Sequence, residues 1–279
     1  MKTIYTALIT PFHTDGSIDF IGLEKIMEDQ INDGVDGFIV NGTTAECLSL
    51  TDEEQFLLLD FVCEKVQGKV AIYFGCGCSD TLQTLKKAKK AQNYPIDGLL
   101  IVTPYYNKPN QEGLYQHYVT IAHNVNLPII LYQVESRTGV VFEIETLQRI
   151  CKECPSIFAL KYASKDIVFA KKIRNEMKTL TLFCGDDSMI KECDEIGMDG
   201  IISVTSHIAL PLMKKYYSQQ DKDLVFFLQR IAKFAFLQSN PSGIKYLLSK
   251  HYGINDVMRL PLVGYTNENK RFVDSYFDT

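Results

Sequence analysis

"GVDGFIVNGTT", residues 34–44, is the stretch that decides the fold. An Asp-Gly pair precedes a short apolar run, and a polar Asn-Gly-Thr-Thr segment follows it. The pattern recurs in "PIDGLLIVTPYY" (95–106) and "GMDGIISVTSH" (197–207). Glycine can end a helix in the left-handed conformation, and a fully apolar run of this length is typical of a strand buried on both faces. Each repeat therefore predicts a helix end, a turn, a buried strand and a loop.

Further apolar runs between the repeats bring the expected number of strands to eight. They are "IYTALIT" (4–10), "KVAIYFG" (69–75), "LPIILYQ" (127–133), "IFALK" (157–161) and "LTLFCG" (180–185). Helical periodicity marks the intervening segments 50–66, 80–92, 111–125, 143–154 and 187–197. The first of these begins with the capping box Thr51-x-x-Glu54.

Eight strands that alternate with helices predict an α/β protein with a (β/α)₈ TIM barrel. A doubly wound open sheet is the alternative, but it often carries a glycine-rich phosphate loop, and "GCGCSD" has the wrong glycine spacing for one. We expect residues 1–209 to form the barrel. Residues 210–279 are then the last barrel helix and a C-terminal helical extension of the same domain.

The composition of the chain argues against several classes of function. The 279 residues are 46% apolar and 23% charged, with a formal net charge of −5. This balance gives no electrostatic footprint for nucleic acid, and no segment approaches the 18 apolar residues of a membrane span. The N-terminus resembles no leader peptide, so we expect a cytoplasmic protein without membrane or nucleic-acid partners.

Eight cysteines include the pairs Cys76/Cys78 and Cys151/Cys154. The pairs lie far apart in segments of different pattern, which favours buried or half-buried free thiols over a zinc site or a redox pair. "CGDDS" (184–188) could suggest a metal site as well. We interpret one of its two aspartates, Asp186 or Asp187, as the N-cap of the next helix and expect no metal.

Lys161 interrupts the apolar run 157–161. A buried lysine must be paired, neutral or at the mouth of a cavity, because an unpaired charge in apolar surroundings is strongly disfavoured. In a TIM barrel the reactive groups lie at the carboxyl ends of the strands. Lys161 ends the sixth predicted strand, and Tyr132 ends the fifth.

A lysine in that position can form a Schiff base. At its ordinary pKa only roughly one lysine in 2,500 is neutral at pH 7, and a desolvating pocket increases that fraction. The neutral amine attacks a ketone, and the iminium allows a proton to leave the neighbouring carbon. Thr43, Tyr106 and Tyr132 are hydroxyl groups of the right type to move protons.

Anion sites are available for acidic substrates. Thr44 and the backbone of its turn could bind a keto acid's carboxylate, and Arg137 that of a second substrate. Taken singly, each residue has an ordinary structural interpretation: a strand-end lysine usually reaches solvent, and an isolated arginine usually forms a surface ion pair. Their coincidence is what favours a catalytic site.

Several motifs resemble those of the dihydrodipicolinate synthase family, in the family's order and over nearly the whole chain. They are "NGTTAECLSLTDEEQ", "VTPYYNKPNQEGLYQHY", "LYQVESRTG", "ALKYAS", "CGDDSM" and "GIISVTS". "TPYYN" followed by "SRTG" favours this family over the related N-acetylneuraminate lyases. The resemblance implies a lyase of the class I aldolase type that condenses pyruvate with L-aspartate 4-semialdehyde in diaminopimelate and lysine biosynthesis.

The resemblance also assigns roles. Lys161 would form the pyruvate Schiff base without a cofactor, and Tyr132, Thr43 and Tyr106 would relay protons. Thr44 and Arg137 would bind the two carboxylates, and the backbone at Ile202, together with Gly185, would line the pyruvate pocket. In the family the Tyr106 equivalent comes from a neighbouring subunit, which implies a homodimer or homotetramer.

The chain departs from the family pattern at Ala45, Gln133, Glu135 and Tyr162. Two alternatives therefore stay open: a pyruvate-type aldolase that cleaves a sialic or 2-keto-3-deoxy sugar acid, and a non-catalytic barrel that binds a keto acid. Lysine-inhibited members carry His, Asn and Glu where this chain has Gln55, Ser79 and Gln83, while Tyr105 matches. We therefore predict weak or absent feedback by L-lysine.

Overall fold

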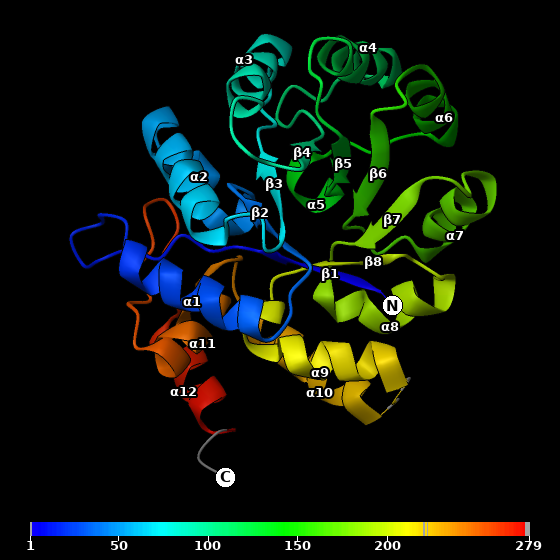
Figure 1. Ribbon diagram of the computed structural model, residues 1–279. Coiled ribbons are helices and arrows are strands. Elements are labelled where there is room, and N and C mark those ends of the chain that lie inside the picture. Colours follow the sequence, from blue (N-terminus) through cyan, green and yellow to red (C-terminus); the bar gives the residue numbers. More distant parts are fainter. Residues whose placement is uncertain (1, 220, 222, 277–279) are drawn as a thin grey trace.

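Eight parallel strands close into a barrel in the part of the chain that this computed structural model describes, residues 2–219, 221 and 223–276 (Figure 1). Each strand pairs with the next along the chain, and β8 pairs with β1. The strands are β1 (Thr3–Ala7), β2 (Gly37–Val40), β3 (Ala71–Gly75), β4 (Gly98–Val102), β5 (Ile129–Gln133), β6 (Ile157–Tyr162), β7 (Thr181–Cys184) and β8 (Gly200–Ser203). The predicted TIM barrel is confirmed.

Most helices form an outer layer around the barrel, whereas the short α5 lies inside this layer, next to β5 (Figure 1). Those that follow the strands are α1 (Phe20–Asn32), α2 (Asp52–Val66), α3 (Thr81–Ala91), α4 (Gln111–Ala122), α5 (Glu135–Thr138), α6 (Ile144–Glu153), α7 (Ile167–Glu176), α8 (Ile190–Ile196) and α9 (Ser206–Gln219). The short 3₁₀ helices are η1 (Thr43–Ala45), η2 (Cys47–Ser49) and η3 (Asp187–Met189). The predicted capping box of α2 is confirmed, because the Thr51 hydroxyl accepts from the Glu54 amide and the Glu54 carboxylate accepts from the Thr51 amide.

Three more helices follow α9: α10 (Asp223–Ala235), α11 (Ser242–Tyr252) and α12 (Asn267–Asp274). They gather at one side of the barrel, near α1 and α9 (Figure 1). The last barrel helix begins at Ser206, a little before the expected position at 210. No helix in the described ranges is long and apolar enough to cross a membrane.

Alternation along the strands separates two hydrophobic cores. In β6, Ala159 packs in the inner core with residues such as Ile130 and Phe183, whereas Leu160 and Tyr162 belong to the outer core beneath the helices. Successive side chains of a strand point to opposite faces, so Lys161 shares the inner face with Ala159. The period of two thus directs the lysine into the barrel.

Candidate active site

A cavity of about 460 Å³ lies at the carboxyl ends of the strands. Its lining residues come from the ends of five strands and from α10 and the segment after it. Those used below are Thr43, Thr44, Tyr132, Arg137, Lys161, Gly185 and Asn240. Most of the residues predicted for the site therefore meet in one place.

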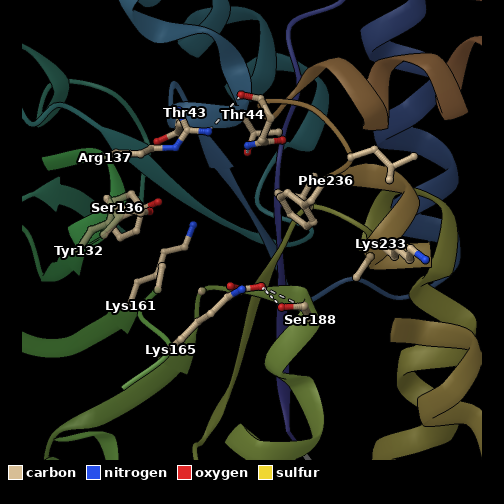
Figure 2. Close-up of a pocket in the computed structure, with 18 of the residues that line it drawn as sticks. Thr43, Thr44, Tyr132, Ser136, Arg137, Lys161, Lys165, Ser188, Lys233 and Phe236 are labelled. Carbon is tan, nitrogen blue, oxygen red and sulfur yellow. Dashed lines mark hydrogen bonds between the residues drawn. The ribbon is translucent and has the colours of Figure 1, made fainter. Parts of the chain in front are cut away.

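Lys161 occupies the inner wall of this cavity, and its side chain extends into the open space (Figure 2). The residue is only 6% exposed. Burial lowers the pKa of its ammonium group to about 8, against the opposing effect of the Asp187 carboxylate. Among the described residues, Lys161 forms no ion pair with a carboxylate; the lysines that do are Lys2, Lys65, Lys87, Lys191, Lys245, Lys250 and Lys270. Lys161 is thus at a cavity mouth and unpaired, which increases the neutral, nucleophilic fraction near pH 7.

Gly185 follows β7 and leaves room for the Lys161 side chain. A Cβ atom at this position would lie 3.0 Å from Cγ and 3.1 Å from Cε of Lys161, and 2.8 Å from Cβ of Ala163. The lysine stem therefore passes directly over the glycine. Any larger residue would push the lysine away from its present course.

Two aspartates follow Gly185 and have different roles. Asp186 caps η3 by accepting from the Ser188 amide, as predicted for one of the pair. Asp187 instead turns inward, where it accepts from the Ser203 hydroxyl, the Val204 amide and the Thr205 hydroxyl at the end of β8. Sequence reasoning missed this inward carboxylate, because both aspartates precede the helix equally well.

Tyr132 lies beside Lys161 on the neighbouring strand, and the two residues are paired in register. Burial raises the pKa of the Tyr132 phenol, and its hydrogen bond with the Thr43 hydroxyl opposes this effect. The phenol is therefore protonated at neutral pH. Tyr132 and Thr43 form a pair of linked hydroxyl groups that can hand a proton to or from a molecule bound at Lys161.

Thr44 and Arg137 face the upper part of the same cavity in Figure 2. Asn240, from the segment between α10 and α11, links these two residues. Its side-chain amide donates to the Thr44 hydroxyl at 3.0 Å, and its backbone carbonyl accepts from Arg137 Nη2 at 3.3 Å. Oδ1 of Asn240 is buried and has no hydrogen-bond partner among the described residues. Nothing in the sequence marked Asn240, because it lies about 200 positions beyond Thr44.

Two predicted site residues do not line this cavity. Tyr106 is 91% exposed, with a left-handed φ of 70°, so it does not converge with Lys161 within one chain. Ile202 is buried in β8 as part of the inner core, and Val204, two residues later, reaches the cavity wall instead.

The departures from the family pattern lie outside this cavity as well. The Gln133 side chain accepts from the Phe142 amide at 2.9 Å, and the Tyr162 hydroxyl donates to the Asp166 carbonyl at 2.8 Å. Both residues alternate away from the inner face. Glu135 is exposed and is not among the lining residues, although Ser136 and Arg137 are.

All eight cysteines are free thiols, five of them buried and three half-buried. Burial raises the pKa of the Cys47 thiol to about 11 and that of Cys151 to about 12, which leaves both protonated at neutral pH. The described residues hold no cluster of three or more metal-ligating side chains. The prediction of buried or half-buried free thiols is confirmed.

Comparison with known proteins gives a consistent result. The model of the dihydrodipicolinate synthetase family matches residues 1–278. A 4-hydroxy-tetrahydrodipicolinate synthase of Desulforamulus reducens is 36% identical, with 94% of this chain and 92% of the relative covered. The enzyme of that name from Bacillus subtilis is 34% identical, with 98% and 97% covered.

Solved structures agree with the sequence relatives. The 4-hydroxy-tetrahydrodipicolinate synthase of Methylacidiphilum fumariolicum superposes with a TM-score of 0.94 at 30% identity, over 100% of this chain and 95% of that one. A pyruvate complex of the dihydrodipicolinate synthase of Acinetobacter baumannii gives 0.93 at 32% identity, over 99% and 98%. By its fold, its length and its sequence, the chain belongs to the dihydrodipicolinate synthetase family.

Proposed function

We propose that this protein is a 4-hydroxy-tetrahydrodipicolinate synthase, a lyase that condenses pyruvate with L-aspartate 4-semialdehyde on the diaminopimelate route to lysine. The observation that carries the proposal is the unpaired Lys161 amine, with a pKa of about 8, beside the linked hydroxyls of Tyr132 and Thr43. No cofactor is needed, because the amine itself activates the ketone.

The chemistry starts at the neutral Lys161 amine. It attacks the carbonyl carbon of pyruvate, and loss of water gives an iminium. A proton then leaves the methyl carbon, and the resulting enamine carbon attacks the aldehyde, whose oxygen takes up a proton. We assign these proton transfers to Tyr132 and Thr43, and the hydrogen bond between their hydroxyl groups supports the assignment. Attack of the semialdehyde's own amino group on the iminium carbon closes the ring and releases Lys161.

Three side chains suit the two substrates. Thr44 is the group for the pyruvate carboxylate. Arg137 presents its guanidinium at the cavity and pairs with no carboxylate of the described chain, which suits an acidic second substrate. The unpartnered Oδ1 of Asn240 beside it suits the amino group of that substrate, because a buried acceptor needs a donor.

An acceptor screen tests the second substrate. With pyruvate present, we expect turnover of L-aspartate 4-semialdehyde and a loss of at least about a hundredfold in kcat/KM for Arg137→Ala. Pyruvate trapping at Lys161 should persist in that variant. Cleavage of a sialic or 2-keto-3-deoxy sugar acid, without turnover of the semialdehyde, would assign the other aldolase function.

We also propose a homodimer or homotetramer in the cytoplasm, in which Tyr106 enters the site of a neighbouring copy. The 91% exposure of Tyr106 supports this assembly, and the free thiols suit a reducing compartment. Mixing of two inactive variants, Tyr106→Phe and Lys161→Arg, tests whether Tyr106 acts in the site of a neighbouring copy. Recovered activity after subunit mixing supports it, and no recovery with proven mixed oligomers contradicts it.

A further inference from the structure

The turn that carries Thr43 and Thr44 is bounded by two residues in an uncommon backbone conformation. Asn41 has a φ of 60° and Glu46 a φ of 56°, and both are non-glycine residues in the left-handed region. This conformation costs a residue such as glutamate about 1 kcal/mol relative to ordinary backbone, whereas asparagine adopts it more readily. The turn therefore depends on outside contacts to keep its shape.

At its start, the turn is fastened to the barrel. The Asn41 side-chain amide donates to the Gly75 carbonyl at 2.7 Å and to Gln55 Oε1 at 3.1 Å. At Ala45, the last residue before Glu46, the Thr10 hydroxyl donates to the backbone carbonyl at 2.8 Å. These contacts hold the backbone of the turn from Asn41 to Ala45.

At its end, the turn is fastened by a buried ion pair with the C-terminal extension. Lys245, on α11, donates to the Glu46 carboxylate, and both side chains are fully buried. Lys245 also donates to the Val257 carbonyl at 2.9 Å and lies 4.1 Å from the centroid of the Phe12 ring. Burial lowers the pKa of Lys245 to about 8, and the Glu46 carboxylate opposes that shift.

Arg259 completes the attachment. Its backbone amide donates to Glu46 Oε2 at 3.0 Å, and its guanidinium donates to the Ser49 and Gly16 carbonyls and to both oxygens of Glu54. The segment after α11 thus holds the loops that follow β1 and β2. Lys245 and the Arg259 amide both bond the Glu46 carboxylate, and Glu46 ends the Thr43–Ala45 turn, so they fix the position at which the turn ends.

We propose that Glu46 is a positioning residue, and that its buried ion pair with Lys245 holds Thr43 and Thr44 in place for pyruvate binding and proton transfer. Glu46 does not line the cavity that holds Lys161, although it borders the adjoining cavity that shares Thr43, Arg137 and Asn240. Its side chain is fully buried against Lys245, so it acts through the turn. This inference rests on the proposed function. It also extends the role of the C-terminal extension in the active site from α10 and Asn240, which line the cavity, to α11.

The test uses variants that do not leave one buried charge without its partner. Removal of one member of a buried pair is strongly destabilising, whereas replacement of both by neutral groups is often tolerated. We choose the double variant Glu46→Gln/Lys245→Met and the milder Glu46→Asp, which keeps the charge and shortens the side chain. Lys250→Met is the matched control, since Lys250 lies on the same helix in an exposed ion pair with Asp274.

The rate of borohydride trapping is measured against pyruvate concentration, and kcat is measured in the condensation. We expect both test variants to need about tenfold more pyruvate for half-maximal trapping and to lose about tenfold in kcat, because small displacements of binding groups are costly. Lys250→Met should match the wild type. Thermal unfolding confirms that each protein compared is folded.

Different results would overturn the positioning role of Glu46 and the proposed function. Folded test variants with wild-type pyruvate dependence and kcat overturn the positioning role. If the double variant does not fold, Glu46→Asp decides by the same criteria. Failure of the wild type to trap pyruvate overturns the proposed function instead, whatever the variants do.

Discussion

The Nζ atom of Lys161 lies 4.5 Å from the centroid of the Tyr132 ring. The two residues are direct partners across β5 and β6. One strand thus supplies the nucleophile, and its neighbour supplies both an apolar wall and a proton-carrying hydroxyl. This arrangement limits the water around the amine and keeps the proton relay within reach of it.

Tyr132→Phe removes only the hydroxyl. We expect kcat for the condensation to fall by about a hundredfold or more, which is the usual size of a lost general acid or base. Trapping of pyruvate should remain measurable, because Lys161 is intact. Tyr162→Phe is the control, since that hydroxyl bonds the Asp166 carbonyl outside the cavity. A kcat for Tyr132→Phe within twofold of the control would contradict the relay.

Gly185→Ala places a methyl group against Lys161. The new Cβ would lie 3.0 Å from Cγ and 3.1 Å from Cε of Lys161, and 2.8 Å from Cβ of Ala163, so the lysine stem and Ala163 must both shift. We expect the rate of pyruvate trapping to fall by about tenfold or more, with a small change in the unfolding temperature. Gly68→Ala controls for stability, because it introduces left-handed strain with nothing within 4 Å. Wild-type trapping in Gly185→Ala would refute the assigned path of the lysine.

Asp187→Asn tests the electrostatics of the lysine. The carboxylate favours the ammonium form and so raises the pKa of Lys161, against the stronger effect of burial. A neutral side chain removes that contribution, so the pKa should fall below about 8. The rise of trapping rate with pH should then move to lower pH. Asp15→Asn, at an exposed residue outside the cavity, should leave the profile in place, and a wild-type profile for Asp187→Asn would exclude the effect.

L-Lysine should inhibit weakly or not at all. A small cavity of about 180 Å³ is lined by Gln55, Tyr105 and Lys87, and the Lys87 ammonium bonds Gln55 Oε1 at 2.9 Å and Asp52 at 3.0 Å. A second ammonium would meet like charge there. Steady-state assays with increasing lysine check this, and inhibition below millimolar concentration would contradict it.

The barrel followed from local patterns in the sequence. Short apolar strands, glycines at helix ends and the Thr51 capping box depend on neighbouring residues, so they could be read directly. Lys161 and Tyr132 were predicted for the same reason, because strand ends meet at one edge of the barrel. The helices α1 and α7 were not singled out, although Asp19 and Asp166 cap them.

Contacts between distant segments could not be predicted. Asn240 meets Thr44, and Lys245 meets Glu46, only because the C-terminal extension folds back over the mouth of the barrel. The side chains of Asn240 and Lys245 point toward the barrel because of tertiary packing, which cannot be predicted from the spacing of residues in the sequence. The same holds for Gln133 and Tyr162, whose outward direction became clear only from the strand register.

Reductive trapping of pyruvate on Lys161 tests the central claim most directly. Borohydride is added to the protein with pyruvate, and peptide mass spectrometry locates the adduct. We predict one reduced pyruvate per chain on the peptide that contains Lys161, and none in Lys161→Arg. Absence of an adduct from the active wild-type protein, or its attachment to another lysine, would contradict the Schiff-base mechanism.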